Sequence, residues 1–123
     1  YDPSRSMATG LLARMGVTTT FFDPRDLDAY AALFADPVKA VWLENPGSLT
    51  FEVCDIPALA AIARQHGAVS MVDNTWASPL GFAALQHGCD IVMMSLSKHV
   101  GGHSDLMMGS ASAGKRWYTA LRR

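Results

Sequence analysis

Residues 68–75 read AVSMVDNT and residues 91–98 read IVMMSLSK, and these two stretches decide the fold class. Each begins with a short, almost continuously apolar segment and changes to polar residues at its end. Short apolar segments of this kind are typical of strands that are covered on both faces of a parallel sheet. We therefore predict strands over 68–72 and 91–94. Their polar ends are expected at one edge of the sheet, where such folds bind ligands.

Helical patterns separate the predicted strands along the chain. Helices are predicted over 4–15, 26–35, 55–66, 79–87 and from 115 onward, and further strands over 17–22, 40–43 and 106–111. Asp55 is placed to cap a helix, and Gly16, Gly67 and Gly88 are placed to follow the last turns as left-handed residues. This alternation predicts an α/β domain with a mainly parallel sheet and flanking helices. The direction of the last strand stays open, because a loop rather than a helix precedes it.

Composition limits the classes of function. The chain has 123 residues, half of them apolar, and a formal net charge of −1, which suits one globular unit and argues against a nucleic-acid or acidic-membrane partner. No apolar run approaches the ~20 residues needed to cross a bilayer. Cys54 and Cys89 lie far apart and form no CxxC, so neither a zinc pattern nor a disulfide framework is indicated. We expect a soluble protein of the reducing cytoplasm.

The ends of the chain predict that it belongs to a longer protein. It begins at Tyr1 without an initiator methionine and stops at Arg123 within a predicted helix. We therefore expect a piece of a larger enzyme or binding protein, with segments on both sides.

Asp73 follows the first of the two deciding strands and has two interpretations. Aspartate and asparagine are common at strand exits, where they stabilise turns. Alternatively, a partly buried carboxylate beside the ring nitrogen of a pyridoxal cofactor would raise the pKa of that nitrogen and keep the ring an electron sink. Asp73 alone does not decide between the two.

Lys98 follows the second deciding strand, and most lysines in proteins are simply solvated. Its setting is unusual, since the Ser95-x-Ser97 pair precedes it and Gly101-Gly102 follows it. A lysine near apolar walls loses proton affinity, which favours imine formation. Hydroxyl groups such as those of Ser95 and Ser97 can bind a phosphate, and glycines allow a close approach of the backbone. With Asp73, these residues form a consistent set.

A metal site is the main alternative for the same loop. His99, His103 and Asp105 could act as three ligands, as in a catalytic zinc centre, although Gly101-Gly102 disfavours the helix that an HxxxH pair would need. His66 and His87 each precede a glycine at a predicted helix end, where a capping role is sufficient. The sequence has no GxxxxGK[ST] and no GxSxG, so neither a P-loop nucleotidase nor a serine hydrolase is supported.

Taken together, these segments resemble a known family. The runs VDNTWASPL (72–80) and SLSKHVGGHSD (95–105), with YDPS, GVTTTFFDP and LENPGSLTFEV before them, resemble the Cys/Met-metabolism family of fold-type I pyridoxal-phosphate (PLP) enzymes. Within that family the cystathionine β-lyases are the most similar. The resemblance covers nearly the whole chain. It implies that residues 1–123 are the central part of the large PLP-binding domain of an aspartate-aminotransferase-like fold, without its N-terminal segment and C-terminal domain.

The resemblance also implies roles for particular residues. Lys98 matches the lysine that holds PLP as a Schiff base, and Asp73 matches the partner of the pyridine nitrogen. Ser95 and Ser97 match hydroxyl residues that bind the cofactor's phosphate.

Two further residues of the site are implied, and two positions depart from the family pattern. Tyr1 matches a tyrosine that stacks on the cofactor and assists catalysis. Ser48 lies near a position where γ-type enzymes carry an asparagine close to the cofactor. His99 stands where tyrosine is usual, and Leu96-Ser97 replaces a commoner Ala-Thr, a change that keeps the hydroxyl group.

The implied activity is PLP-dependent β-elimination of cystathionine or a related cysteine thioether, in a cytoplasmic homotetramer. A γ-lyase or an O-acyl-homoserine sulfhydrylase of the same family is an alternative, and so is a non-catalytic fragment that only binds a partner. In the family, the arginine that binds the substrate carboxylate and the glycine turn that binds the phosphate lie outside these 123 residues. The chain alone is therefore expected to be inactive.

Overall fold

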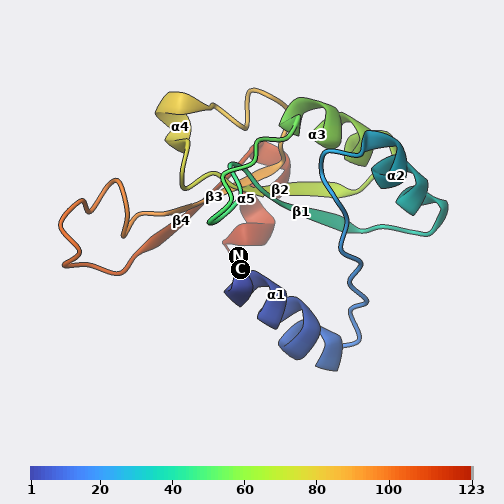
Figure 1. Cartoon of the computed structure of the whole chain (residues 1–123), viewed down its shortest axis with the longest axis horizontal. Coiled ribbons are helices and arrows are strands. Elements are labelled where there is room, and N and C mark those ends of the chain that lie inside the picture. The colour runs from blue at the N-terminus through green and yellow to red at the C-terminus, as the bar shows by residue number, and fades with distance from the viewer. Residues whose placement is uncertain (123) are drawn as a thin grey trace.

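A four-stranded sheet forms the centre of the computed structural model, which describes residues 1–122. Its strands are β1 (Ala40–Glu44), β2 (Val69–Asp73), β3 (Ile91–Ser95) and β4 (Gly109–Ala113), and they lie side by side in chain order (Figure 1). The first three strands are parallel, and β4 is antiparallel to β3. The predicted α/β architecture with a mainly parallel sheet is therefore confirmed.

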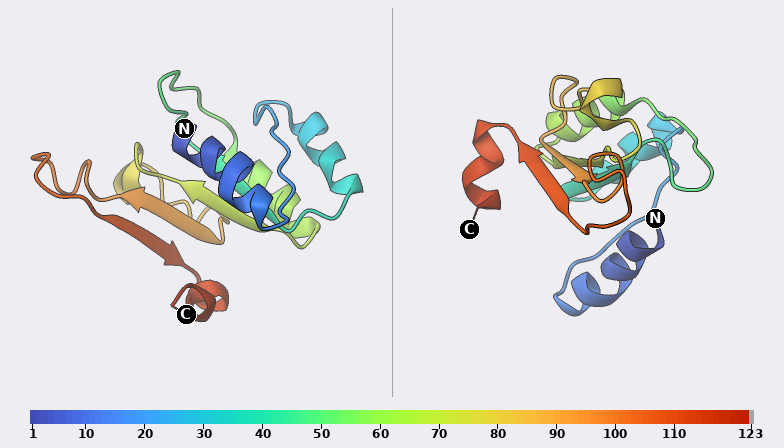
Figure 2. Two further views of the ribbon diagram at one scale, coloured as in Figure 1. Left: turned by 90° about the horizontal axis from the view of Figure 1, so that it is seen from below. Right: turned by 90° about the vertical axis from the view of Figure 1, so that its left-hand side faces the viewer.

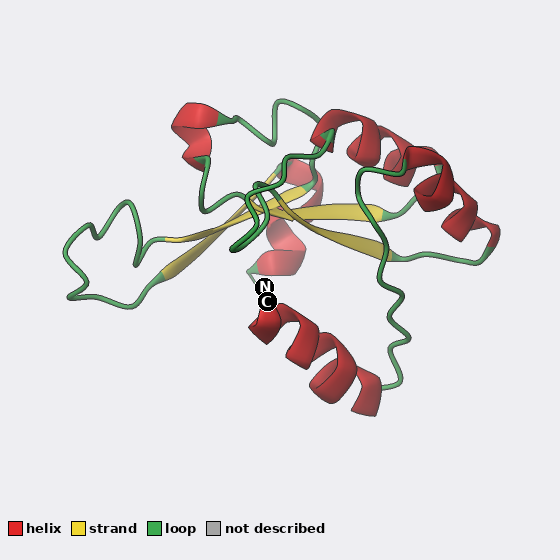
Figure 3. Ribbon diagram, viewed as in Figure 1, coloured by secondary structure: helices red, strands yellow, loops and turns green. Residues whose placement is uncertain are grey.

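The reversed direction of β4 follows from its connection. Between β3 and β4 the chain runs through residues 96–108 without a helix that could carry it back along the sheet (Figure 3). A parallel neighbour needs a crossover of a dozen or more residues, usually helical, whereas a loop that turns back gives an antiparallel pair. Ile91 pairs with Ala113, and Ser95 pairs with Gly109. The strand thus begins three residues later than the 106–111 range predicted from the sequence.

Helix α3 (Ile56–Gln65) is the main cover of the sheet. The Asp55 side chain accepts a hydrogen bond from the Ala58 N–H at 3.0 Å, and Gly67 has a φ of +73°, so the predicted cap and stop are both confirmed. The face with Leu59 and Ala63 is fully buried against the strands. The positions of these apolar residues, four apart, explain why the helix was predictable.

Helix α2 (Leu27–Ala32) continues into a 3-10 turn, η2 (Leu33–Ala35), and together they fill the predicted 26–35 range. The Tyr30 ring is 1% exposed, and its hydroxyl donates to the Leu59 carbonyl at 3.2 Å. This contact joins α2 to α3 on the same face of the sheet (Figures 1 and 2). Burial raises the pKa of Tyr30 to about 12, so its hydroxyl stays a donor.

The first segment is helical, but the strand predicted after it does not form. Helix α1 (Asp2–Met7) runs on into a π-helical segment, η1 (Ala8–Leu12), on the side of the sheet opposite α3 (Figures 1 and 2). Residues 17–22 are extended without a neighbouring strand. Phe21 is half exposed under the Arg5 guanidinium, 4.2 Å from its ring centroid. β-branched residues favour strands only where there is a sheet to join, so composition misled the prediction here.

The helix predicted over 79–87 is also wrong. Only a single turn, α4 (Ser78–Gly81), is helical, and Phe82 is extended with φ −149° and ψ 110°. The Asn74 side-chain amide donates a hydrogen bond to the Phe82 carbonyl at 2.9 Å, and this bond competes with continuation of the helix. His87 therefore caps no helix; its ring stacks on Phe82 at 4.7 Å. Gly88 does have the expected left-handed conformation, with φ of +101°.

The last helix, α5 (Lys115–Leu121), starts where it was predicted and packs beside β4. It is fastened to the sheet by Asp90, which lies just before β3. One Asp90 oxygen accepts from the Ser70 N–H and hydroxyl at 3.0 and 3.1 Å. The other oxygen accepts from the Trp117 indole N–H at 3.1 Å. Asp90 thus connects α5 with the start of two strands.

Replacing Asp90 with alanine is expected to lower the free energy of unfolding by about 2–4 kcal/mol, because the donors of Ser70 and Trp117 would lose their acceptor. Urea titration followed by Trp fluorescence measures the loss. Asp105 is exposed and serves as the matched control, and its alanine variant is expected to unfold like the wild type. Equal midpoints for the two variants would contradict the fastening role of Asp90.

Candidate functional site

A pocket of about 400 Å³ lies at the carboxyl ends of β1, β2 and β3. Its walls come from the strand ends, from the loops that follow them and from the start of α1. The lining residues are Tyr1, Glu44, Pro46, Ser48, Asp73, Thr75, Trp76, Ser95, Lys98 and His99. Both deciding strands of the sequence thus end at one pocket, at the edge where parallel sheets hold ligands.

Five of the six residues that the resemblance assigns to the PLP site line this pocket. They come from four separate segments of the chain: Tyr1, Ser48, Asp73, Ser95 and Lys98. Their placement brings a carboxylate, an amine, a phenol and two hydroxyl groups to one cavity. The functions assigned to them by resemblance remain predictions.

Asp73 serves as a turn residue, and its second oxygen is free for a ligand. Its Oδ1 accepts a hydrogen bond from the Thr75 N–H at 2.9 Å, as in the turn interpretation. The Thr75 hydroxyl in turn accepts from the Ser95 N–H at 2.8 Å and so joins the ends of β2 and β3. Within residues 1–122, this arrangement leaves Oδ2 of Asp73 available at the pocket. The two interpretations of Asp73 are therefore compatible.

Lys98 lies in a tight loop directly after β3. Its N–H donates to the Ser95 carbonyl at 3.2 Å, and its carbonyl accepts from the Gly102 N–H at 2.9 Å. A Cβ on Gly101 would lie 3.2 Å from the Leu96 carbonyl oxygen, so this glycine closes the loop rather than making room for a ligand. The Lys98 side chain is exposed at the pocket mouth. Pro46 and Trp76 line the same pocket, so apolar groups are present at the site although Lys98 itself stays exposed.

Ser97 is the one predicted site residue that does not line the pocket. Its hydroxyl accepts from the Met108 N–H at 2.7 Å and donates to the Met108 carbonyl at 3.1 Å. These hydrogen bonds join the two ends of the loop that carries Lys98. Its assignment to phosphate binding stays a prediction, since a bound phosphate would have to compete with Met108.

Glu44 was missed from the sequence, although it lines the pocket beside Asp73. It is the last residue of β1, and the strand register places it opposite Asp73. A signal for it was present, because Glu44 ends an apolar strand just as Asp73 does.

The aromatic wall of the pocket was also missed. Trp76 contacts Phe51 edge to face at 4.8 Å and lies 6.1 Å from the His99 ring. The metal alternative finds no support in the described part of the chain. No group of three His, Cys, Asp or Glu side chains within residues 1–122 is arranged to hold a metal ion.

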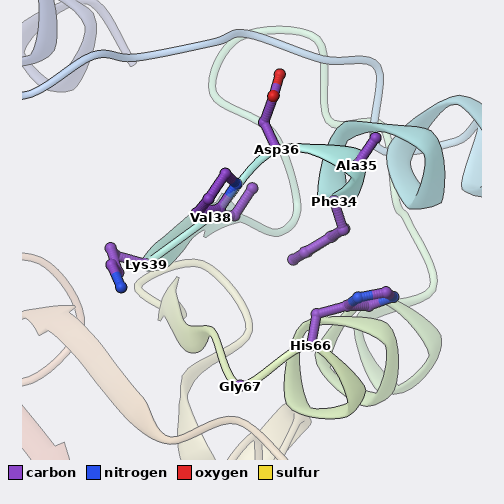
Figure 4. A pocket seen from close by; sticks show the side chains of 8 residues that line it. Phe34, Ala35, Asp36, Val38, Lys39, His66 and Gly67 are labelled. Atoms are coloured by element: carbon purple, nitrogen blue, oxygen red, sulfur yellow. The ribbon is translucent and has the colours of Figure 1, made fainter.

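A second hollow, of about 270 Å³, lies at the opposite end of the strands (Figure 4). It is lined by residues 34–39, which precede β1, and by His66 and Gly67, which precede β2. The His66 ring stacks on Phe34 at 4.7 Å. Figure 4 shows the Asp36 and Lys39 side chains pointing apart rather than converging. This hollow lacks the convergent polar groups of a ligand site.

The donor set of the first pocket fits PLP. An amine for its aldehyde (Lys98), a free carboxylate oxygen for its ring nitrogen (Asp73 Oδ2) and an aromatic ring (Tyr1) all line one cavity. The volume of about 400 Å³ is within the range of small-molecule sites.

No helix within residues 1–122 has the length and apolar character to cross a membrane.

Comparison with known proteins identifies the family of the chain. The family model described as "Cys/Met metabolism PLP-dependent enzyme" matches residues 1–123. A putative cystathionine β-lyase of Saccharomyces cerevisiae is 45% identical over 122 residues, which are 99% of this chain and 36% of the relative. The cystathionine β-lyase of Escherichia coli is 41% identical over 125 residues, or 99% of this chain and 31% of the relative.

A solved structure gives the same picture. The chain resembles cystathionine γ-lyase from Lactobacillus plantarum, complexed with L-serine, with a TM-score of 0.87 and 35% identity. The match covers 95% of this chain and 31% of that one. The chain spans about a third of the length of the curated relatives it matches. It belongs to the Cys/Met-metabolism family of PLP-dependent enzymes.

Proposed function

We propose that this chain is the central part of the PLP-binding domain of a longer carbon–sulfur lyase. The reaction is β-elimination of cystathionine or a related cysteine thioether. With cystathionine and water, the products are homocysteine, pyruvate and ammonia. The observation that carries the proposal is the convergence of Lys98, Asp73 and Tyr1 on one pocket from separate segments of the chain.

PLP, when bound, supplies an electron sink for the pair of electrons left at Cα of the substrate. Asp73 holds the positive charge of the ring nitrogen through its free Oδ2, while Thr75 fixes Oδ1. Tyr1 forms one wall of the cofactor site, and the Ser95 hydroxyl group binds the phosphate, joined by that of Ser97 where the phosphate displaces its contacts with Met108. Ser48 lines the same pocket and would lie close to the cofactor.

Lys98 has two tasks in this proposal. Its amine would hold the cofactor through the aldehyde group. The same amine would also remove the proton from Cα of the substrate and deliver it to the leaving sulfur. Overall, the Cβ–S bond of the thioether is broken, the thiol takes up the proton removed from Cα, and one water accounts for the release of pyruvate and ammonia. Exposure of Lys98 at the pocket mouth suits an amine that must swing between these tasks.

Borohydride reduction of the full-length protein with PLP, followed by peptide mapping, tests the site. A pyridoxyl group on Lys98 is the expected result. Lys39 is exposed at the opposite end of β1 and is the internal control, since nonspecific labelling would modify it as well. A folded protein without label on Lys98 would refute the proposed cofactor site and favour a fragment that only binds a partner.

A γ-lyase is the second candidate, favoured by the likeness to the Lactobacillus plantarum enzyme. Product analysis with cystathionine separates the two reactions. β-Cleavage gives homocysteine and pyruvate, whereas γ-cleavage gives cysteine and 2-oxobutyrate. We expect homocysteine and pyruvate as the main products. A sulfhydrylase of the same family would instead consume an O-acyl-homoserine together with a thiol or sulfide.

We further propose that the parent enzyme is a cytoplasmic homotetramer. Both cysteines are free, and burial raises the pKa of the Cys89 thiol to about 11, which keeps it protonated and unreactive. This state of the cysteines suits the reducing cytoplasm.

The proposed homotetramer is tested separately. Light scattering of the full-length protein measures the assembly, and a monomer would contradict the proposal.

A further inference from the structure

Asn45 is a buried polar residue at the base of the loop that follows β1. It is 8% exposed and is not among the residues that line the candidate site. Its backbone N–H donates to the Asp73 carbonyl at 3.3 Å, which continues the pairing of β1 with β2 beyond the last strand residue. Polar side chains this deeply buried are normally hydrogen-bonded, so the contacts of the Asn45 side chain indicate its task.

The Asn45 side chain joins the end of β1 to the start of α3. Its Oδ1 accepts a hydrogen bond from the Cys54 N–H at 2.9 Å, and the Cys54 thiol donates to the same oxygen at 3.5 Å. Cys54 directly precedes Asp55, the capping residue of α3. Both strand and helix contribute residues to the hydrophobic core. One side chain thus closes the loop of residues 46–53 between two core elements.

The loop of residues 46–53 needs such a closure (Figure 1). Leu49 and Phe51 have φ of +69° and +56°, the left-handed region that residues other than glycine rarely adopt. Conformations of this kind persist only where surrounding contacts impose them. Within the loop, the Gly47 N–H donates to the Glu52 carbonyl at 2.9 Å. The side-chain contact at the base encloses this inner hydrogen bond.

The same loop supplies part of the pocket wall. Pro46 and Ser48 line the pocket directly. Phe51 packs edge to face on Trp76, another lining residue, with 4.8 Å between the ring centroids. The Ser48 hydroxyl also donates to Glu44, so the wall has a second support besides the base of the loop. Loosening the base is therefore expected to displace this wall in part rather than to remove it.

We infer that Asn45 is a positioning residue of the PLP site: its hydrogen bond to the Cys54 backbone holds residues 46–53 in the conformation that completes the pocket. The inference rests on the proposed function, because it concerns cofactor binding. The contact uses the side-chain oxygen as an acceptor. The role therefore requires an accepting oxygen at position 45 rather than an amide as such.

Two substitutions in the full-length protein test the inference. Asn45→Leu keeps a branched side chain and removes the acceptor; Asn45→Ala replaces it if the leucine variant does not fold. Asn45→Asp keeps an oxygen that accepts from the Cys54 N–H in either protonation state. Amide hydrogen exchange over residues 46–54 of the cofactor-free protein measures how firmly the loop is held. Titration with PLP measures affinity, and the circular dichroism of bound PLP reports how its ring is held.

Two controls separate the proposed contact from other effects. Cys54→Ala removes the thiol and keeps the N–H that Asn45 binds. Asp90→Ala weakens the fold at the start of β3, at the end of the strand opposite Ser95, and Asp90 lies outside the pocket lining. It therefore reproduces a general loss of stability without a change in the loop.

Asn45→Leu is expected to speed exchange in the loop and to weaken PLP binding about fivefold, the size of one hydrogen bond, with an altered circular dichroism spectrum. Asn45→Asp is expected to restore slow exchange. In PLP affinity, Asn45→Asp and the two controls are expected to stay within about twofold of the wild type, with an unchanged spectrum.

Several results would overturn the inference. Wild-type exchange or wild-type PLP affinity in Asn45→Leu would show that the contact does not hold the loop or that the loop does not serve the site. An equal loss of affinity in Asn45→Asp, Cys54→Ala or Asp90→Ala would assign the effect to the amide, to the thiol or to general stability. Wild-type protein without saturable PLP binding would refute the proposed function and the inference together, whereas normal wild-type binding with an insensitive Asn45→Leu would refute the inference alone.

Discussion

Replacing Lys98 with alanine is expected to reduce the rate of pyruvate formation from cystathionine by about 10³-fold or more, because the variant lacks both the covalent anchor and the base. Lys98 is exposed in its loop, and its backbone contacts with Ser95 and Gly102 do not involve the side chain. The fold should therefore tolerate alanine, and the loss should appear in kcat rather than in the amount of folded protein.

The control is Lys39→Ala, which removes another exposed lysine at the opposite end of the sheet and should keep wild-type turnover. Steady-state kinetics with cystathionine measure both variants, and thermal unfolding checks that they are folded. Pyruvate formation by Lys98→Ala at more than about a tenth of the wild-type rate would exclude Lys98 as the base.

Strands β1, β2 and β3 and helix α3 could be predicted because their signals are local. β1, β2 and β3 are short apolar runs, and α3 has a capping aspartate at its start and a left-handed glycine at its end. The failures came where tertiary contacts decide. The Asn74 side-chain amide donates to the carbonyl of Phe82, and α4 ends after one turn. Residues 17–22 have strand composition but no strand to pair with.

The location of the site could be predicted from the sequence, but its individual side-chain contacts could not. Parallel strands end at a common edge, so the meeting of Asp73 with Lys98 follows from topology. The contacts of a particular side chain do not follow in this way. That the Ser97 hydroxyl binds the backbone of Met108, and that Glu44 is held by Ser48, depends on how loops fold back after the strands. Sequence spacing carries no information about those loop paths.

Replacing Asp73 with asparagine is expected to lower turnover by about 100-fold. A neighbouring carboxylate raises the pKa of a cationic group by ~1–3 units. If the pKa of the ring nitrogen falls by about two units to a value below the assay pH, the protonated fraction of the ring falls by about 100-fold. The fold should be preserved, since the amide oxygen of asparagine can still accept from the Thr75 N–H that Oδ1 now binds. The change thus removes the charge and keeps the turn.

The pH dependence gives this prediction a definite sign. Without the Asp73 charge, the pKa of the ring nitrogen falls, so the variant should recover part of its activity as the pH is lowered, whereas the wild type should not. Rate profiles against pH measure this, with Asp36→Asn, an exposed aspartate near the other end of the sheet, as the matched control. An Asp73→Asn profile that is lowered equally at every pH would mean that Asp73 only shapes the turn. If the activity of Asp73→Asn recovers at low pH and that of Asp36→Asn does not, Oδ2 of Asp73 is the partner of the ring nitrogen. This is the oxygen that does not bind Thr75.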